Sequence, residues 1–118
     1  MDDTINLQAD LEAFRELVNR NPLVSKIIKG WDRSILIQSK DTGEAYLLIV
    51  GQGKLLSVGR AQSDAPCDIR VRASKDTLHR MFTGRAKSAE LYLHGAVEVY
   101  GSPKDQLKLD GIATLLWG

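Results

Sequence analysis

The sequence contains a single cysteine, Cys67, in 118 residues. One cysteine cannot form an internal disulfide, and an unpaired thiol is typical of a reducing compartment. The first residues, Met1, Asp2 and Asp3, are acidic and are not followed by the apolar run of a secretory signal. We therefore expect a cytoplasmic protein whose fold depends on its hydrophobic core.

Long apolar runs are also missing. The longest covers residues 45–50, whereas a membrane-spanning helix needs about 20 apolar residues. Basic residues are not in excess, because the net charge is +1, and nucleic-acid binding depends on a basic footprint. The composition, with 43% hydrophobic and 26% charged residues, predicts one globular domain over residues 1–118 and no nucleic-acid partner.

The chain lacks the motifs that enzymes commonly carry. It contains no GxSxG, CxxC or HExxH pattern and no pair of histidines at metal-binding spacing. His79 and His94 stand alone, and we interpret both as structural or surface residues. We place Cys67 on the inward face of a strand, where a thiol packs as a small apolar group. We expect no catalytic residue, no metal site and no cofactor.

Helical periodicity is clear at both ends of the chain. Leu7, Leu11, Phe14 and Val18 form one apolar stripe. A second helix is predicted to begin at Asn21 and Pro22 and to end before Gly30. Three more helices are expected, one from Ser74 to Gly84, a short one over residues 88–93, and a last one over Pro103–Trp117.

Alternating patterns between these helices predict five strands. They cover residues 34–40, 44–50, 54–58 and 67–73, and a last strand contains Val97 and Val99. A short turn with Gly43 joins the first two strands, and residues 60–66 are polar and aperiodic, as in a loop. This order of elements predicts an α+β fold with a mainly antiparallel sheet.

Two features of the chain leave alternatives open. The strand over residues 46–50 has no polar face, so it is either a central strand covered on both sides or a surface for a ligand or a second copy of the chain. Charge is also uneven, since six of the seven charged residues from position 70 to 87 are basic. This segment is either a solvated face or a contact for an anionic membrane or ligand head group, and its basic residues are Arg70, Arg72, Lys75, Arg80, Arg85 and Lys87.

Five short motifs, taken in order, resemble those of the sterol carrier protein 2 family. Residues 65–71 are similar to the family's alanine, cysteine-or-alanine, aspartate and apolar strand pattern. Residues 74–78 resemble its helix start, and residues 81–85 resemble its helix end with threonine, glycine and a basic residue. Residues 89–95 and 97–101 match its alanine, apolar, glycine, strand and glycine pattern. The resemblance covers about residues 23–117.

The resemblance implies a five-stranded sheet with helices on one face and an apolar cavity between the sheet and the C-terminal helix. It also implies a non-catalytic carrier of a sterol, fatty acyl chain, acyl-CoA or phospholipid. The alternative is an interaction module with a filled core that forms a homodimer through the sheet, or an accessory subunit that presents lipid to an enzyme. For the carrier, the expected ligand-lining residues are Ile69, Val71, Met81, Phe82, Leu91, Leu93, Val97, Val99, Leu109, Ile112, Leu116 and Trp117.

Overall fold

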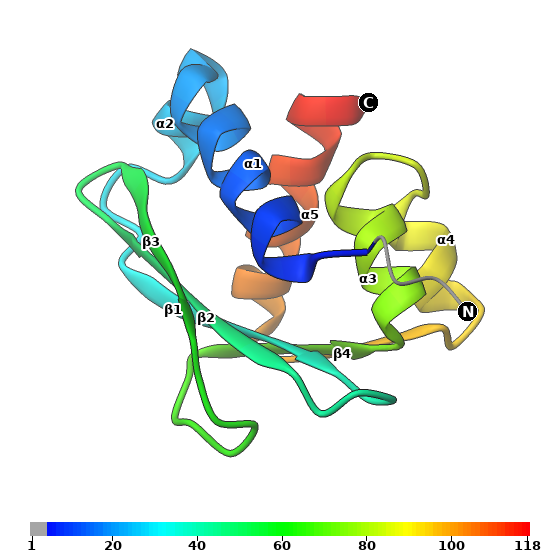
Figure 1. The fold of residues 1–118 in the computed structure, drawn as a ribbon. Helices are drawn as coiled ribbons and strands as arrows, with labels where there is room; N and C mark the ends of the chain where they lie inside the picture. The colour runs from blue at the N-terminus through cyan, green and yellow to red at the C-terminus, as the bar shows by residue number, and fades with distance from the viewer. Residues whose placement is uncertain (1–4) are drawn as a thin grey trace.

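Five helices lie on one face of a five-stranded sheet in the computed structural model, which describes residues 5–118 (Figure 1). This confirms the α+β class and the helices on one face. The ten elements, in chain order, are α1 Leu7–Arg20, α2 Pro22–Ile27, β1 Arg33–Ser39, β2 Ala45–Gly51, β3 Lys54–Arg60, β4 Ile69–Ala73, α3 Lys75–Phe82, α4 Ser88–Leu93, β5 Val97–Tyr100 and α5 Pro103–Trp117.

The strand order across the sheet is β3-β2-β1-β4-β5. Three neighbouring pairs are antiparallel, and β1 runs parallel to β4 in the centre. Ile35 pairs with Leu48 on one side and with Ile69 on the other, so these side chains share the face that the helices cover. The sheet is therefore mainly antiparallel, as predicted, with one parallel pair that joins its two halves.

The helix starts are set by local hydrogen bonds, as the sequence predicted. The Asn21 side chain accepts hydrogen bonds from the backbone N–H groups of Leu23 and Val24, with Pro22 in the first turn of α2. The Ser74 hydroxyl caps α3, and the Ser102 hydroxyl caps α5. Each cap satisfies a backbone donor that has no partner within its helix.

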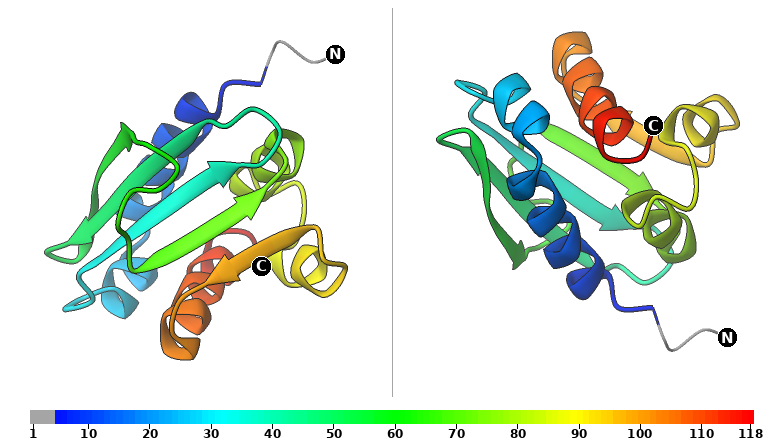
Figure 2. Two further views of the ribbon diagram at one scale, coloured as in Figure 1. Left: turned by 90° about the horizontal axis from the view of Figure 1, so that it is seen from below. Right: turned by 90° about the horizontal axis from the view of Figure 1, so that it is seen from above.

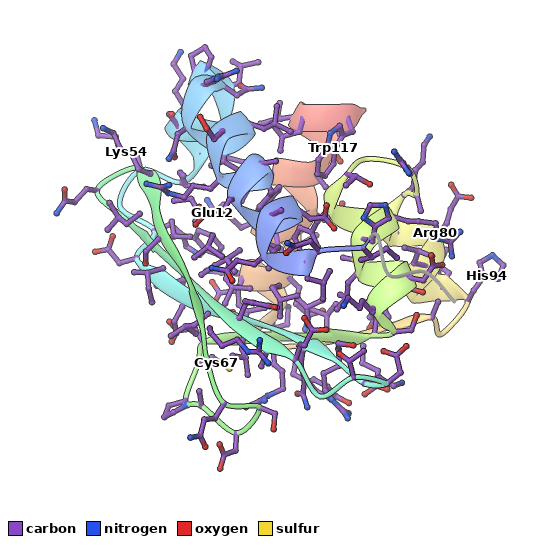
Figure 3. All side chains as sticks on the ribbon, viewed as in Figure 1. Glu12, Lys54, Cys67, Arg80, His94 and Trp117 are labelled. Atoms are coloured by element: carbon purple, nitrogen blue, oxygen red, sulfur yellow. The ribbon has the colours of Figure 1, made fainter. Side chains whose placement is uncertain are left out.

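The fourth strand begins later than predicted, and this corrects the placement of Cys67. The Asp68 carboxylate accepts a hydrogen bond from the backbone N–H of Ser34 at 2.8 Å. In a longer strand, this N–H group would instead donate to a backbone carbonyl. Strand β4 therefore begins at Ile69, and Cys67 is half-buried in the segment before it, labelled in Figure 3. Cys67 is thus not part of the strand's inward face.

The outer face of the sheet is covered in part by the segment between β3 and β4. This segment crosses the side of the sheet away from the helices, as the left view of Figure 2 shows. The Arg70 guanidinium holds it there by donating hydrogen bonds to the carbonyls of Ser63 and Ala65. Leu36 points to this face and is nevertheless fully buried. The apolar strand, β2, lies inside the sheet between β3 and β1. Its inner-face side chains Tyr46, Leu48 and Val50 are buried, whereas Leu47 and Ile49 on its outer face are only partly buried.

The main core lies between the inner face of the sheet and the helices. Leu7, Leu11, Phe14 and Val18 of α1 are all buried there, which confirms the predicted stripe. None of the helices in residues 5–118 is long and apolar enough to cross a bilayer.

Candidate functional site

Eleven of the twelve expected ligand-lining residues lie in the layer between the sheet and the helices. Five of them are buried in the core: Ile69, Val71, Phe82, Val97 and Ile112. The other six pack against the core and remain partly exposed: Met81, Leu91, Val99, Leu109, Leu116 and Trp117. The five buried residues are thus covered by neighbouring side chains, whereas the six partly exposed residues border solvent.

Leu93 is the exception, because it is 82% exposed. It is the last residue of α4, a six-residue helix that buries no side chain. Helical geometry turns Leu93 away from Leu91, and only Leu91 packs against the core. The expectation that Leu93 lines the site together with the others is therefore corrected.

An aromatic cluster closes the top of this layer. Phe14 of α1 contacts Phe82 of α3 edge-to-face, with ring centroids 5.1 Å apart. The centroid of the Phe14 ring also lies 5.9 Å from that of the Trp117 ring. Figure 3 shows Trp117 at the end of α5, on the side where α1 and α3 lie. Gly84, just after α3, leaves the space for this indole, because a Cβ atom built there would lie 2.6 Å from it.

The partly exposed residues follow a seam along α4, β5 and α5. Leu91 comes from α4, Val99 from β5, and Leu109 and Leu116 from α5. The side chain at the α4 N-cap, Lys87, makes no capping hydrogen bond. Short helices without caps or buried side chains open at low free-energy cost. We therefore expect α4 to open at low free-energy cost.

Two of the hollows on the described surface, both open to solvent, lie on different sides of the sheet. The first lies on the outer face of the sheet and is mainly polar; its lining residues are Gln38, Ser63, Asp64, Arg70, Arg72 and Tyr100. The second has a volume of about 520 Å³ and is mainly apolar; its lining residues are Ile27, Trp31, Arg33, Lys104, Asp105, Leu107, Lys108 and Gly111. We call the second one the α2–α5 groove. The internal cavity implied by the family resemblance stays an expectation.

A buried carboxylate holds one end of the α2–α5 groove in place. Asp105 is 7% exposed and accepts a hydrogen bond from the Trp31 indole N–H at 2.8 Å. The Arg33 Nε–H donates to both of its oxygens, at 3.1 and 3.0 Å. Burial of Asp105 raises the pKa of its carboxyl, but the hydrogen bonds from Trp31 and Arg33 outweigh this, so that its pKa is below the ordinary value.

The two histidines have different surroundings. His79 Nδ1 lies 2.7 Å from an Asp10 carboxylate oxygen, and its Nε2 lies 3.4 Å from an Arg85 nitrogen. His79 thus links α3 to α1. His94 follows α4 on the exposed surface (Figure 3). Within residues 5–118, no three histidine, cysteine or acidic side chains gather into a group that could hold a metal ion.

The basic segment does not form one surface. Arg70 and Arg72 lie on the outer face of the sheet, whereas Lys75 and Arg80 belong to α3 on the helix side. Arg72 pairs with Glu98 at 3.0 Å, and the pKa of Glu98 is about 2 because Lys40, Tyr100 and Arg72 all stabilise its charge.

The remaining pairs neutralise the α3 side of this segment. Lys75 contacts Glu44 at 2.9 Å, and Arg80 contacts Asp76 at 3.3 Å. Together with the split between two faces, these pairs favour the first of the two alternatives, a solvated face.

Sequence reasoning missed the groove residues Trp31, Arg33 and Asp105. Asp105 lies more than 70 positions from Trp31 and Arg33 in the chain, and no local pattern joins it to them. One signal was present in α5, where Lys104, Leu107, Lys108 and Gly111 fall at helical spacing on one face.

Solved structures with this fold belong to proteins of different kinds. A sterol carrier protein 2 crystal structure matches with a TM-score of 0.70 and 16% identity, over 92% of this chain and 93% of that one. A ubiquinone synthesis protein, UbiJ-SCP2, matches with a TM-score of 0.66 and 17% identity, over 93% and 95%. A stereoselective inverting sec-alkylsulfatase from Pseudomonas sp. matches with a TM-score of 0.61 and 20% identity, over 80% of this chain and 14% of that one.

A sequence comparison with curated proteins gives no significant match. The family comparison is decisive, because residues 11–114 match the model of the SCP-2 sterol transfer family. The match begins within α1 and ends within α5, and it includes the seam residues Leu91, Val99 and Leu109. The chain therefore belongs to the SCP-2 sterol transfer family.

Proposed function

We propose that this domain is a non-catalytic carrier that binds a lipid or another apolar ligand between the sheet and helices α3, α4 and α5. The observation that carries the proposal is the seam, where three elements contribute apolar side chains that pack against the core but stay partly exposed. Removing a hydrocarbon chain from water stabilises the complex by about 0.8 kcal/mol per buried CH₂. A ligand that inserts its chain along the seam would also cover these side chains.

The surroundings of the seam support this proposal. Helix α4 is short and buries no side chain completely, so moving it aside breaks mainly the contacts of Leu91 with the core. The names of two similar structures, a sterol carrier protein and a ubiquinone synthesis protein, also support the proposal. Both names concern molecules with large apolar parts.

The alternative, a filled-core module that forms a homodimer through the sheet, is not favoured. The outer face of the sheet carries the charged side chains of Arg70, Arg72 and Glu98, and the segment between β3 and β4 lies across it. A stable homodimer interface is usually more apolar than this.

Titration with a fatty acid or acyl-CoA tests the proposal. Trp117 borders the seam, so its fluorescence should change saturably, with a Kd in the roughly micromolar range. Trp31 lies in the α2–α5 groove, and a Trp31→Phe variant removes its background signal. Native mass spectrometry of the freshly purified protein should show co-purified lipid. If several lipid classes give no saturable change and no lipid co-purifies, the carrier function is wrong.

Leu116→Ala separates a ligand site from a filled core. In a packed core this change costs about 2–5 kcal/mol, but Leu116 is only partly buried, so we expect a loss near the lower end of that range. Lipid affinity should fall at the same time, because the side chain borders the proposed site. Urea denaturation with and without bound lipid measures both effects. A large loss of stability that lipid does not change would show that Leu116 belongs to a filled core.

A further inference from the structure

We propose that the α2–α5 groove is a second binding site, on the outside of the molecule, for an anionic amphiphile with a single hydrocarbon chain, such as a fatty-acid anion. The groove is distinct from the seam, because the two share no residue: the seam uses Leu109 and Leu116 of α5, and the groove does not. Its volume of about 520 Å³ lies within the range of small-molecule sites.

The floor of the groove suits a hydrocarbon chain. Ile27 of α2 and Gly111 of α5 approach each other closely, since a Cβ atom on Gly111 would lie 3.7 Å from the Ile27 side chain. Leu107, one turn before Gly111, is 72% exposed. Ile27 packs over Gly111 and, with Leu107, forms an apolar strip on the surface between the two helices, which suits a hydrocarbon chain lying along it.

The charges at the groove select an anion. Asp105 is the only acidic residue among those that line it, and Arg33 neutralises this carboxylate at 3.0 Å. Two lysines remain, Lys104 and Lys108, which are one helical turn apart on α5. Within residues 5–118, neither lysine takes part in a salt bridge. A carboxylate head group between them would gain two charge-assisted contacts while its chain lies on the floor.

The two tryptophans report on the two sites separately. Trp31 lines the groove, and its indole is fixed by the hydrogen bond to Asp105. Trp117 packs on Phe14 at the other end of the helix layer. A Trp117→Phe variant therefore leaves a reporter for the groove alone, and a Trp31→Phe variant leaves one for the seam.

Titration of the Trp117→Phe variant with laurate, below its micelle concentration, tests the groove. We expect a saturable change in Trp31 fluorescence and a much weaker response to uncharged dodecanol. Reversing both lysines, Lys104→Glu with Lys108→Glu, should weaken laurate binding roughly tenfold or more, because two attractive contacts become repulsive. The matched control is Arg80→Glu with Arg85→Glu, which makes the same change of charge at two residues that do not line the groove and should leave Kd unchanged.

Gly111→Leu provides a test that does not depend on charge. Leucine favours a helix more than glycine does, so this variant should remain folded while its side chain covers the apolar strip and abolishes the Trp31 response. If Gly111→Leu fails to fold, Gly111→Ala replaces it, since its Cβ makes only an ordinary contact, and weaker binding is then expected.

Three results would overturn the proposal: no laurate response at Trp31, equal binding of dodecanol, or equal losses in the two charge-reversal variants. A response at Trp117 without one at Trp31 would leave the carrier function standing and remove only the groove.

Discussion

Replacing Gly84 with alanine is expected to destabilise the protein and to displace the Trp117 indole. Gly84 has a φ of +75°, which costs an L-residue about 1–2 kcal/mol. The new Cβ would also lie 2.6 Å from the Trp117 ring, and such overpacking costs about 1–3 kcal/mol more. Urea denaturation measures the loss, and the emission maximum of Trp117 in a Trp31→Phe background should shift to the red as the ring becomes exposed.

Gly95→Ala is the matched control for this prediction. Gly95 has nearly the same φ, +73°, but no atom lies within 4 Å of the position of its Cβ. This variant should show the cost of the backbone conformation alone and no change in Trp117 emission. Equal losses of stability in the two variants would mean that the contact between Gly84 and Trp117 contributes nothing.

The second large effect is expected for Asp105→Ala. This change leaves the Trp31 indole N–H and the Arg33 guanidinium without their shared acceptor, and an unsatisfied buried polar group costs about 1–3 kcal/mol. Asp105→Asn keeps an acceptor for Trp31 but removes the negative charge, so its loss should be smaller. Urea denaturation at neutral pH should give the highest free energy of unfolding for the wild type, a lower one for Asp105→Asn and the lowest for Asp105→Ala.

The pH dependence of the same variants tests the role of the charge. The pKa of Asp105 is lowered in the folded protein, so its contribution is fully present above its unfolded pKa of about 3.9. This contribution to stability is lost as the pH falls through the lower pKa that Asp105 has in the folded state. The difference in stability between wild type and Asp105→Asn should therefore be constant from neutral pH down to about pH 5 and shrink below about pH 4. A difference that persists unchanged in strong acid would contradict this.

The predicted ligand-lining residues illustrate where sequence reasoning succeeds and where it stops. Alternation in Ile69, Val71, Val97 and Val99 placed them on one face of the sheet, because side-chain direction in a strand has a strict period of two. Leu93 was misplaced, because a six-residue helix gives too few turns to tell its buried side from its exposed side.

Helix starts, strand alternation and family motifs were all readable from the sequence, because each depends on residues only a few positions apart. Asn21 with Pro22 and Ser102 with Pro103 begin their helices as expected. Three features were decided only by the tertiary structure: the parallel pairing of β1 with β4, the cover over Leu36 and the division of the basic segment between two faces.

The α2–α5 groove was also decided only by the tertiary structure. Trp31, Arg33 and Asp105 meet because the return of the chain through β5 brings α5 beside α2, and contacts between such distant residues leave no periodic trace in the sequence.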